Sequence, residues 1–137
     1  MAAESRHLRE LPEAKSMHLL ASTSFGRLVF SQHALPAIRL VNHIVDNGTV
    51  IIRTHLAGTV LAPAGTVVAY EADVIDPHTH LGWSVIVTGL AEWVTDARDV
   101  VRYEQMLRTW GDGDMDQAIR IRPHLVTGLE FVGDGGD

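Results

Sequence analysis

The stretch LPAIRLVNHIVDNGTVIIRT, residues 35–54, decides the fold of this 137-residue chain. Two mainly apolar runs, 35–45 and 49–54, flank the tripeptide Asp46-Asn47-Gly48. Asn and Gly tolerate the positive φ angles that two-residue hairpin turns require. The stretch therefore predicts a β-hairpin in which residues 49–54 pair back on residues 35–45.

Further strands are predicted on both sides of this hairpin. They cover residues 25–31, 66–75 and 82–94, followed by two short strands in AIRIRPHLV (118–126) and GLEFV (128–132). Gly89, inside the segment 82–94, predicts a bulge, a bend or a close backbone approach. Because the strands follow one another without alternating helices, the pattern favours an antiparallel barrel over a parallel sheet.

Two helices complete the predicted elements. Pro12 fits the first turn of a helix that extends to about Ser22. Asp96 is a suitable N-cap for a second helix over residues 97–110, which carries an apolar stripe at spacings of three and four. The whole chain, 1–137, is expected to be one domain, with residues 1–9 and 133–137 flexible.

The composition excludes several classes of protein. The formal net charge of −6 disfavours binding to nucleic acid or to an anionic membrane surface, which depends on Lys and Arg. There is no cysteine, so disulfides and thiolate chemistry are excluded. No apolar run approaches the length of about 20 residues that a membrane helix needs. We expect a cytoplasmic protein that binds neither nucleic acid nor membrane.

Arg39 and Arg53 form the first candidate site. Both lie in the predicted hairpin, near Asn42, Thr54 and Thr59. Guanidinium groups beside such side chains can bind a phosphate through several donors at once. The alternative is that each arginine faces solvent on the outer side of the sheet.

A second candidate is a metal site in DVIDPHTH, residues 73–80. Two histidines, His78 and His80, lie close to Asp73 and Asp76, and a divalent metal accepts such ligands. However, Asp76-Pro77 is typical of a turn, and no further ligand follows at a recognised spacing. We therefore predict no metal and interpret this segment as a polar loop.

Aromatic and titratable side chains give further candidates. Trp83 could lie on a flat heterocycle with Ser84 offering a hydrogen bond, or it could be a core or dimer-interface residue. His43 and His55 flank the hairpin and can carry protons near neutral pH, although a packed or exposed histidine is the simpler interpretation. The chain has no nucleophile elbow, Rossmann fingerprint or P-loop. No catalytic side chain is assigned.

The sequence resembles the pyridoxamine 5′-phosphate oxidase-like family of flavin-binding split barrels, in particular its small actinobacterial-type branch. The resemblance is carried by SFGRLVF (24–30), residues 35–54, VVAYEADVID (67–76), GWSVIVTGLAEWVTD (82–96) and IRPHLVTGLEF (121–131). It implies a mainly β protein with an antiparallel, Greek-key type six-stranded split barrel and short helices. It also implies a homodimer with FMN at the dimer interface.

The resemblance assigns cofactor-binding residues in four segments. It implies a phosphate contact by Arg39 and backbone groups of Leu40, Val41 and Asn42 under the flavin ring. Arg53 and Thr54 match a strand end that meets the flavin or its phosphate. Gly58, Thr59 and Val60 match a turn that closes on the phosphate. Trp83 and Ser84 match a position that offers a polar group to the ring from the second subunit.

Val60 departs from the family pattern, because many members carry a lysine there. The loss of one charge-assisted contact of about 1.5–3 kcal/mol weakens affinity by roughly 10- to 100-fold. The expected function is an FMN-dependent oxidoreductase with a small-molecule substrate. The alternative is a non-catalytic or regulatory split-barrel dimer that binds a deazaflavin, haem or another ligand. The acidic C-terminal segment does not favour oxidation of vitamin B6.

Overall fold

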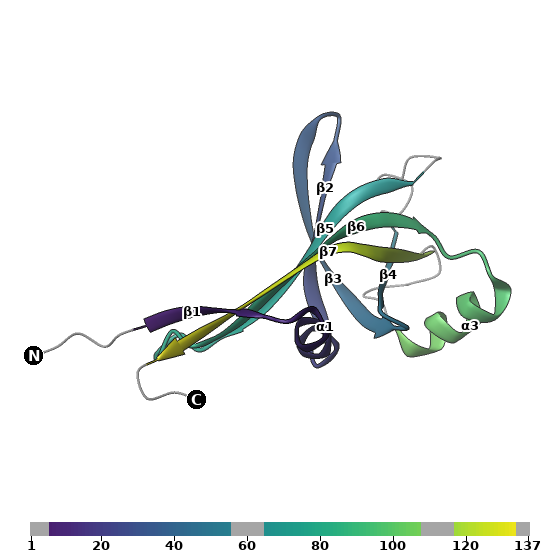
Figure 1. Ribbon diagram of the computed structural model, residues 1–137. Coiled ribbons are helices and arrows are strands. Elements are labelled where there is room, and N and C mark those ends of the chain that lie inside the picture. The colour runs from purple at the N-terminus through teal and green to yellow at the C-terminus, as the bar shows by residue number, and fades with distance from the viewer. Residues whose placement is uncertain (1–5, 56–64, 108–116, 134–137) are drawn as a thin grey trace, which may run out of the picture.

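The computed structural model describes residues 6–55, 65–107 and 117–133, which form antiparallel strands and two helices (Figure 1). In chain order, these elements are β1 (Arg6–Leu11), α1 (Glu13–Ala21), β2 (Phe25–Gln32), β3 (Leu35–Asp46), β4 (Thr49–Thr54), β5 (Thr66–Ile75), β6 (Gly82–Trp93), α3 (Ala97–Met106) and β7 (Gln117–Gly133). None of the helices in these ranges is both long enough and apolar enough to cross a membrane.

Strand β7 closes the barrel because it pairs with two strands at once. Residues 117–121 of β7 pair with β4, and residues 119–131 pair with β6. The order around the barrel is β7-β4-β3-β2-β5-β6, and β6 returns to β7. The predicted antiparallel six-stranded split barrel is therefore confirmed, with β1 added outside it.

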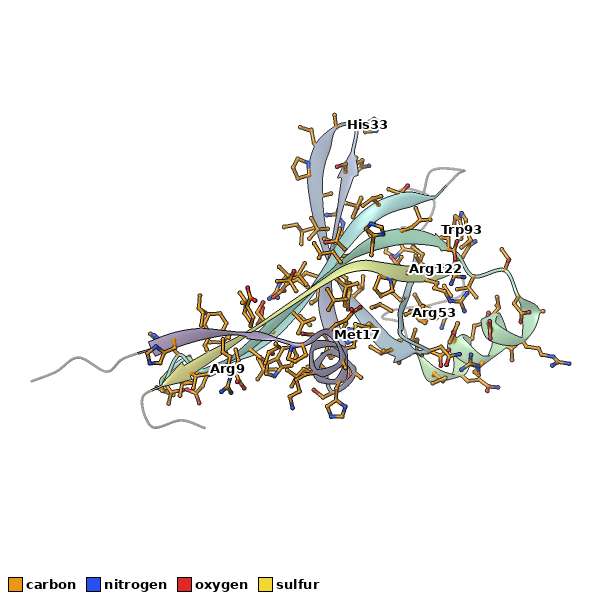
Figure 2. The ribbon with its side chains drawn as sticks, in the orientation of Figure 1. Arg9, Met17, His33, Arg53, Trp93 and Arg122 are labelled. Atoms are coloured by element: carbon orange, nitrogen blue, oxygen red, sulfur yellow. The ribbon has the colours of Figure 1, made fainter. Side chains whose placement is uncertain are left out.

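Two parts of the sheet extend beyond the barrel (Figure 1). The second half of β7 runs outward between β1 and the β5–β6 hairpin, so that Leu8, Phe131, Gly82 and Ile75 lie in one cross-strand row. The β2–β3 hairpin projects in another direction, and Figure 2 shows His33 at its tip. The exposed end of this hairpin leaves residues 35–40 largely outside the core.

Three local predictions are confirmed. Asn47 and Gly48 have φ angles of 50° and 72°, and Asp46 pairs with Thr49, as a two-residue hairpin turn requires. The Asp96 carboxylate caps α3 by accepting from the backbone N–H groups of residues 98 and 99. The β6–β7 register shifts at Gly89, where an added Cβ would lie 1.9 Å from the carbonyl oxygen of Arg122. A glycine is required at this position.

Two expectations about the chain ends are wrong. Residues 6–9 are not loose, because they belong to β1 and pair with the end of β7. The two short strands predicted over residues 118–132 are one continuous strand of 17 residues. Pro123 does not end this strand because it lies opposite Gly89, where the ladder is already irregular. Residues 108–110, the predicted end of the second helix, lie outside the described residues.

Two packed clusters hold the barrel and its helices together. The barrel interior is filled by alternate side chains of its strands, closed by Leu20 of α1. Glycine at position 128 lets α1 approach β7, since a Cβ there would lie 1.9 Å from the Ser16 hydroxyl oxygen. On the other side, Tyr103 and Leu107 pack α3 and the residue after it against Ile51, Val94 and Ala118.

A polar network also ties α3 to the barrel. The Asp46 carboxylate accepts hydrogen bonds from the Tyr103 hydroxyl at 2.5 Å and from Arg102 at 2.9 Å. Arg120 of β7 donates to the same Tyr103 oxygen at 3.1 Å. The hydrogen bonds of Arg102 and Tyr103 hold the pKa of Asp46 below its ordinary value.

Candidate functional site

Arg39 and Arg53 lie on different parts of the sheet. Arg39 pairs with Leu28 of β2, whereas Arg53 pairs with Ala118 of β7. The paired part of the β3–β4 ladder ends at His43, four residues from Arg39, which is about 13 Å along an extended strand. The two guanidinium groups are thus held separately by the strands.

Each arginine also has its own carbonyl partner. Arg39 is exposed and donates from Nη1 to the carbonyl oxygen of Ile38 at 2.8 Å. Arg53 is half-buried and donates from Nη1 to the carbonyl oxygen of Leu107 at 2.9 Å, just beyond α3. Figure 2 shows Arg53 on the side of the barrel that faces α3. Arg53 therefore joins β4 to α3, and Arg39 is the more accessible cation.

A pocket of about 280 Å³ lies beside Arg53. Its remaining described lining residues come from the segment that joins β6 to α3, from α3 and from β7: Val94, Val100, Glu104, Gln117 and Ala118. The Glu104 carboxylate in this lining disfavours a second anion there.

The backbone edge of β3 is the feature that the predicted cofactor residues share. Within the described part of the chain, β4 pairs with residues 43–46 of β3 only. Residues 35–42 pair with β2 on their other side. This leaves a strand edge of N–H and C=O groups along Leu35–Val41, next to the Arg39 guanidinium. Gly58, Thr59 and Val60 lie outside the described residues.

The predicted cofactor residues divide between two faces of the sheet. Leu40 and Asn42 point to the outer side of the barrel, and Ser84 does so on β6. Val41 and Thr54 are buried, and Trp83 packs against the main core. Trp83 and Ser84 are adjacent on one strand and so face opposite sides. A ligand that contacts residues on both faces has to extend around the edge of a strand or bind between this chain and a second chain.

An apolar surface on the outside of the barrel was not predicted from the sequence. We call it the outer face, and it consists of Val29, Ile38, Leu40, Val67, Ala69, Ile86, Leu90 and Leu125. Cross-strand pairing connects Ile38, Val29, Ala69, Thr88 and Leu125 in one row. Val67 is 67% exposed and Leu125 is 60% exposed. Along each strand, outward-facing side chains alternate with those that face the core, and this alternation can be read from the sequence. Only the pairing of the strands in the barrel shows that the apolar outward-facing side chains form one surface.

One charged cluster interrupts the outer face. Arg27 of β2 donates to the Glu71 carboxylate at 2.9 Å and lies 3.5 Å from Asp73, both on β5. Burial raises the pKa of Glu71 to about 6, and its hydrogen bond with Asp73 adds to the increase. The cluster thus contains a carboxyl group that titrates closer to neutrality than an ordinary glutamate.

His43 is packed inside the barrel, and His55 is exposed. The His43 ring lies edge-on to Tyr70 and within hydrogen-bond distance of it. Its burial lowers the pKa of the imidazole. This agrees with the interpretation of His43 as a packed residue, because its side chain is buried.

The segment 73–80 forms a turn. The Asp76 carboxylate accepts from the backbone N–H groups of His78 at 2.7 Å and Thr79 at 3.0 Å. In the portion of the chain that the structure describes, no group of three or more His, Asp or Glu side chains is arranged to hold a metal ion. Asp76 therefore has a turn-forming role in this loop.

Comparison with known proteins supports this description. Residues 12–130 match the model of the pyridoxamine 5′-phosphate oxidase family. The uncharacterised protein Rv0080 of Mycobacterium tuberculosis is 48% identical over 136 residues, which cover 95% of this chain and 90% of that protein.

Two solved structures with 28% identity are also similar. A conserved protein of unknown function from Corynebacterium diphtheriae has a TM-score of 0.74, with 91% of this chain and 98% of that chain covered. The FAD-binding protein of Mycobacterium smegmatis has a TM-score of 0.69, with 91% and 99% covered.

The closed barrel of β2–β7 and its flanking helices define a split-barrel protein. With the family match over residues 12–130, the chain belongs to the pyridoxamine 5′-phosphate oxidase family.

Proposed function

We propose that this protein is a homodimeric flavoprotein that binds FMN and acts as an oxidoreductase on a small molecule. The observation that carries the proposal is the strand edge of β3 over Leu35–Val41, with Arg39 beside it, in a chain of this family. The 28% identity to an FAD-binding protein from Mycobacterium smegmatis supports a flavin as the ligand class.

Several described residues fit a flavin in chemical terms. A flavin needs an apolar surface for its ring, a few hydrogen-bonding groups at the ring edges and a cation for its phosphate. Leu40 offers apolar surface, Ser84 a hydroxyl group, and Arg39 an exposed guanidinium. The β3 edge adds backbone donors and acceptors. Arg53, held by Leu107, is better suited to positioning α3 than to binding the phosphate.

The division of these groups between two faces supports a dimer. Arg39 and Leu40 are consecutive on β3 and point to opposite sides, so one chain presents them in different directions. A second copy packed on the outer face would turn an open sheet surface into a cleft. The exposed apolar side chains of the outer face also favour burial against a partner.

In this proposal the cofactor, when bound, supplies the hydride or electron transfer. The chain binds and orients it, and the apolar outer face excludes water from one side of the ring. No side chain in the described residues is assigned a catalytic role. This division of labour is common for flavoproteins, in which the protein contributes binding, orientation and polarity.

The proposal is tested by titrating the purified protein with FMN, FAD and a deazaflavin while following ligand fluorescence and the melting temperature. We expect FMN to bind, and Arg39→Ala to weaken its affinity by about 10- to 100-fold through loss of a charge-assisted contact. The control is Arg9→Ala, which removes an exposed arginine from β1, where this strand pairs with the distant end of β7. No binding of any of the three ligands would overturn the proposal.

A further inference from the structure

The cluster of Arg27, Glu71 and Asp73 borders the apolar part of the outer face, with Leu40 of β3 and Ile86 of β6 on its two sides. Arg27 is directly opposite Leu40 on one side and Glu71 on the other, and Glu71 is opposite Ile86. The neighbouring row runs from Ile38 to Leu125 and is apolar except for Thr88. A partner that covers the outer face would therefore cover these three charged groups as well.

The charges of the cluster do not cancel when both carboxylates are ionised. One guanidinium then faces two carboxylates, at 2.9 Å and 3.5 Å, which leaves a net charge of −1. No other charged side chain faces Glu71 in the described residues, since β3 contributes Leu40 and β6 contributes Ile86 and Ser84 at this point. A single proton on Glu71 brings the cluster to neutrality.

We propose that the outer face is a pH-dependent interface between two copies of this chain, closed when a proton on Glu71 neutralises the cluster. The inference rests on the proposed homodimer and adds its regulation. It assigns control of assembly to Glu71, Asp73 and Arg27, none of which is among the residues proposed to contact the flavin. The dimer forms most tightly at mildly acidic pH and weakens as the pH rises.

The physical reason is the cost of removing a net charge from water. An ion pair with matched charges can be buried, whereas an uncompensated carboxylate is strongly disfavoured in an apolar contact. In a two-fold symmetric dimer the same cluster is present on both copies, so an unprotonated interface would bury two such charges. Coverage by a second copy would also raise the pKa of Glu71 above its value of about 6 in the single chain, since further burial disfavours the ionised form.

The charge distribution favours a second copy over other occupants. The chain carries a net charge of −6, which disfavours nucleic acid and anionic lipid. Near the end of β6, the other charged pair on this side, Arg122 and Glu92, is internally matched. With Glu71 protonated, the outer face is apolar and neutral. Such a surface is complementary to itself, as a two-fold symmetric interface requires.

The test is sedimentation velocity of the full chain from pH 5.0 to 8.0 at constant ionic strength, for the wild type, Glu71→Gln and Glu130→Gln. Formation of the dimer takes up two protons, one on each copy. Above pH 6 the dissociation constant of the dimer can therefore rise by up to about 100-fold for each pH unit. Glu71→Gln should be tightly dimeric and independent of pH. Glu130→Gln removes a carboxylate paired with Arg9 on the β1–β7 arm, and it should follow the wild type.

The outcomes separate this inference from the proposed function. A wild-type dimer whose dissociation constant does not change with pH would overturn the inference and leave the dimer intact. The same holds if Glu71→Gln keeps the wild-type pH dependence. A monomer at every pH would instead contradict the dimer itself. If Glu71→Gln melts well below the wild type, Asp73→Asn provides the second variant, with the same predicted loss of pH dependence.

Discussion

The Nδ1 atom of His43 lies 2.5 Å from the hydroxyl oxygen of Tyr70, and its Nε2 atom lies 2.9 Å from the carbonyl oxygen of Leu20. A carbonyl oxygen only accepts, so Nε2 carries the hydrogen and Nδ1 accepts from the Tyr70 hydroxyl. This pair joins β3, β5 and the end of α1 through a neutral imidazole inside the barrel. Burial lowers the pKa of His43 and raises that of Tyr70.

The first prediction concerns acid stability. The folded chain holds His43 below its ordinary pKa of 6.5, so the unfolded chain binds an extra proton once the pH falls below that value. This contribution to the free energy of unfolding is complete above pH 6.5 and decreases as the pH falls. Urea unfolding should therefore show a larger difference between the wild type and His43→Gln at pH 7.5 than at pH 5.5. An equal difference at both pH values would contradict this, with the exposed His18→Gln as the control.

Glycine is predicted to be required at position 26 because the Tyr70 ring leaves no room for a side chain there. A Cβ at position 26 would lie 2.5 Å from the hydroxyl oxygen and ring carbon Cζ of Tyr70, which is fully buried. Gly26→Ala should lower the free energy of unfolding by about 1–3 kcal/mol, the usual cost of overpacking a core. Calorimetry or urea unfolding measures the loss. Gly26→Ala should cost less in a Tyr70→Leu background than in the wild type, and an equal cost in both would show that another contact is responsible.

The hydroxyl group of Tyr103 is predicted to stabilise the packing of α3. Its hydrogen bond to the Asp46 carboxylate is lost in Tyr103→Phe, which should lower the free energy of unfolding by roughly 1.5 kcal/mol. Val101→Ala, at an exposed position of the same helix, should change it by no more than about 0.5 kcal/mol. Equal effects of the two substitutions in urea unfolding would contradict the assigned role.

Leu125 tests the outer face as an interface. Its side chain is 60% exposed in the single chain, so Leu125→Glu should leave the melting temperature of the monomer almost unchanged. A buried charge opposing the second copy should weaken the dimer at least 10-fold. Light scattering coupled to size exclusion measures this. Val101→Glu, exposed but on α3, should remain dimeric, and a dimeric Leu125→Glu would place the interface elsewhere.

The sequence predicts features that depend on neighbouring residues. The Asn47-Gly48 turn, the bulge at Gly89 and the cap at Asp96 each follow from one or two side chains. The continuous strand β7 was predicted as two strands that divide just before Gly128, because a glycine weakens a strand. Here the close approach of Ser16 in α1 requires that glycine. The strand β1 was missed because its pairing partner lies at the far end of the chain.

The predicted site depends on cross-strand register, which spacing along the chain does not contain. Arg39 and Arg53 belong to one hairpin, yet the paired part of that hairpin ends before it reaches Arg39. The ion pair of Arg27 and Glu71 joins residues 44 positions apart. The outer face is assembled in the same way from several strands. Such surfaces form only when the barrel closes, and local sequence patterns alone do not determine how the barrel closes.

The central claim is that this protein binds FMN between two copies of the chain. The most direct measurement is size exclusion of the protein after incubation with excess FMN, with light scattering and an absorbance spectrum recorded on the same peak. We expect a dimer that carries flavin absorbance at one FMN per chain. A protein peak free of flavin, from a sample in which excess FMN also gives no fluorescence quenching and no rise in melting temperature, would contradict it.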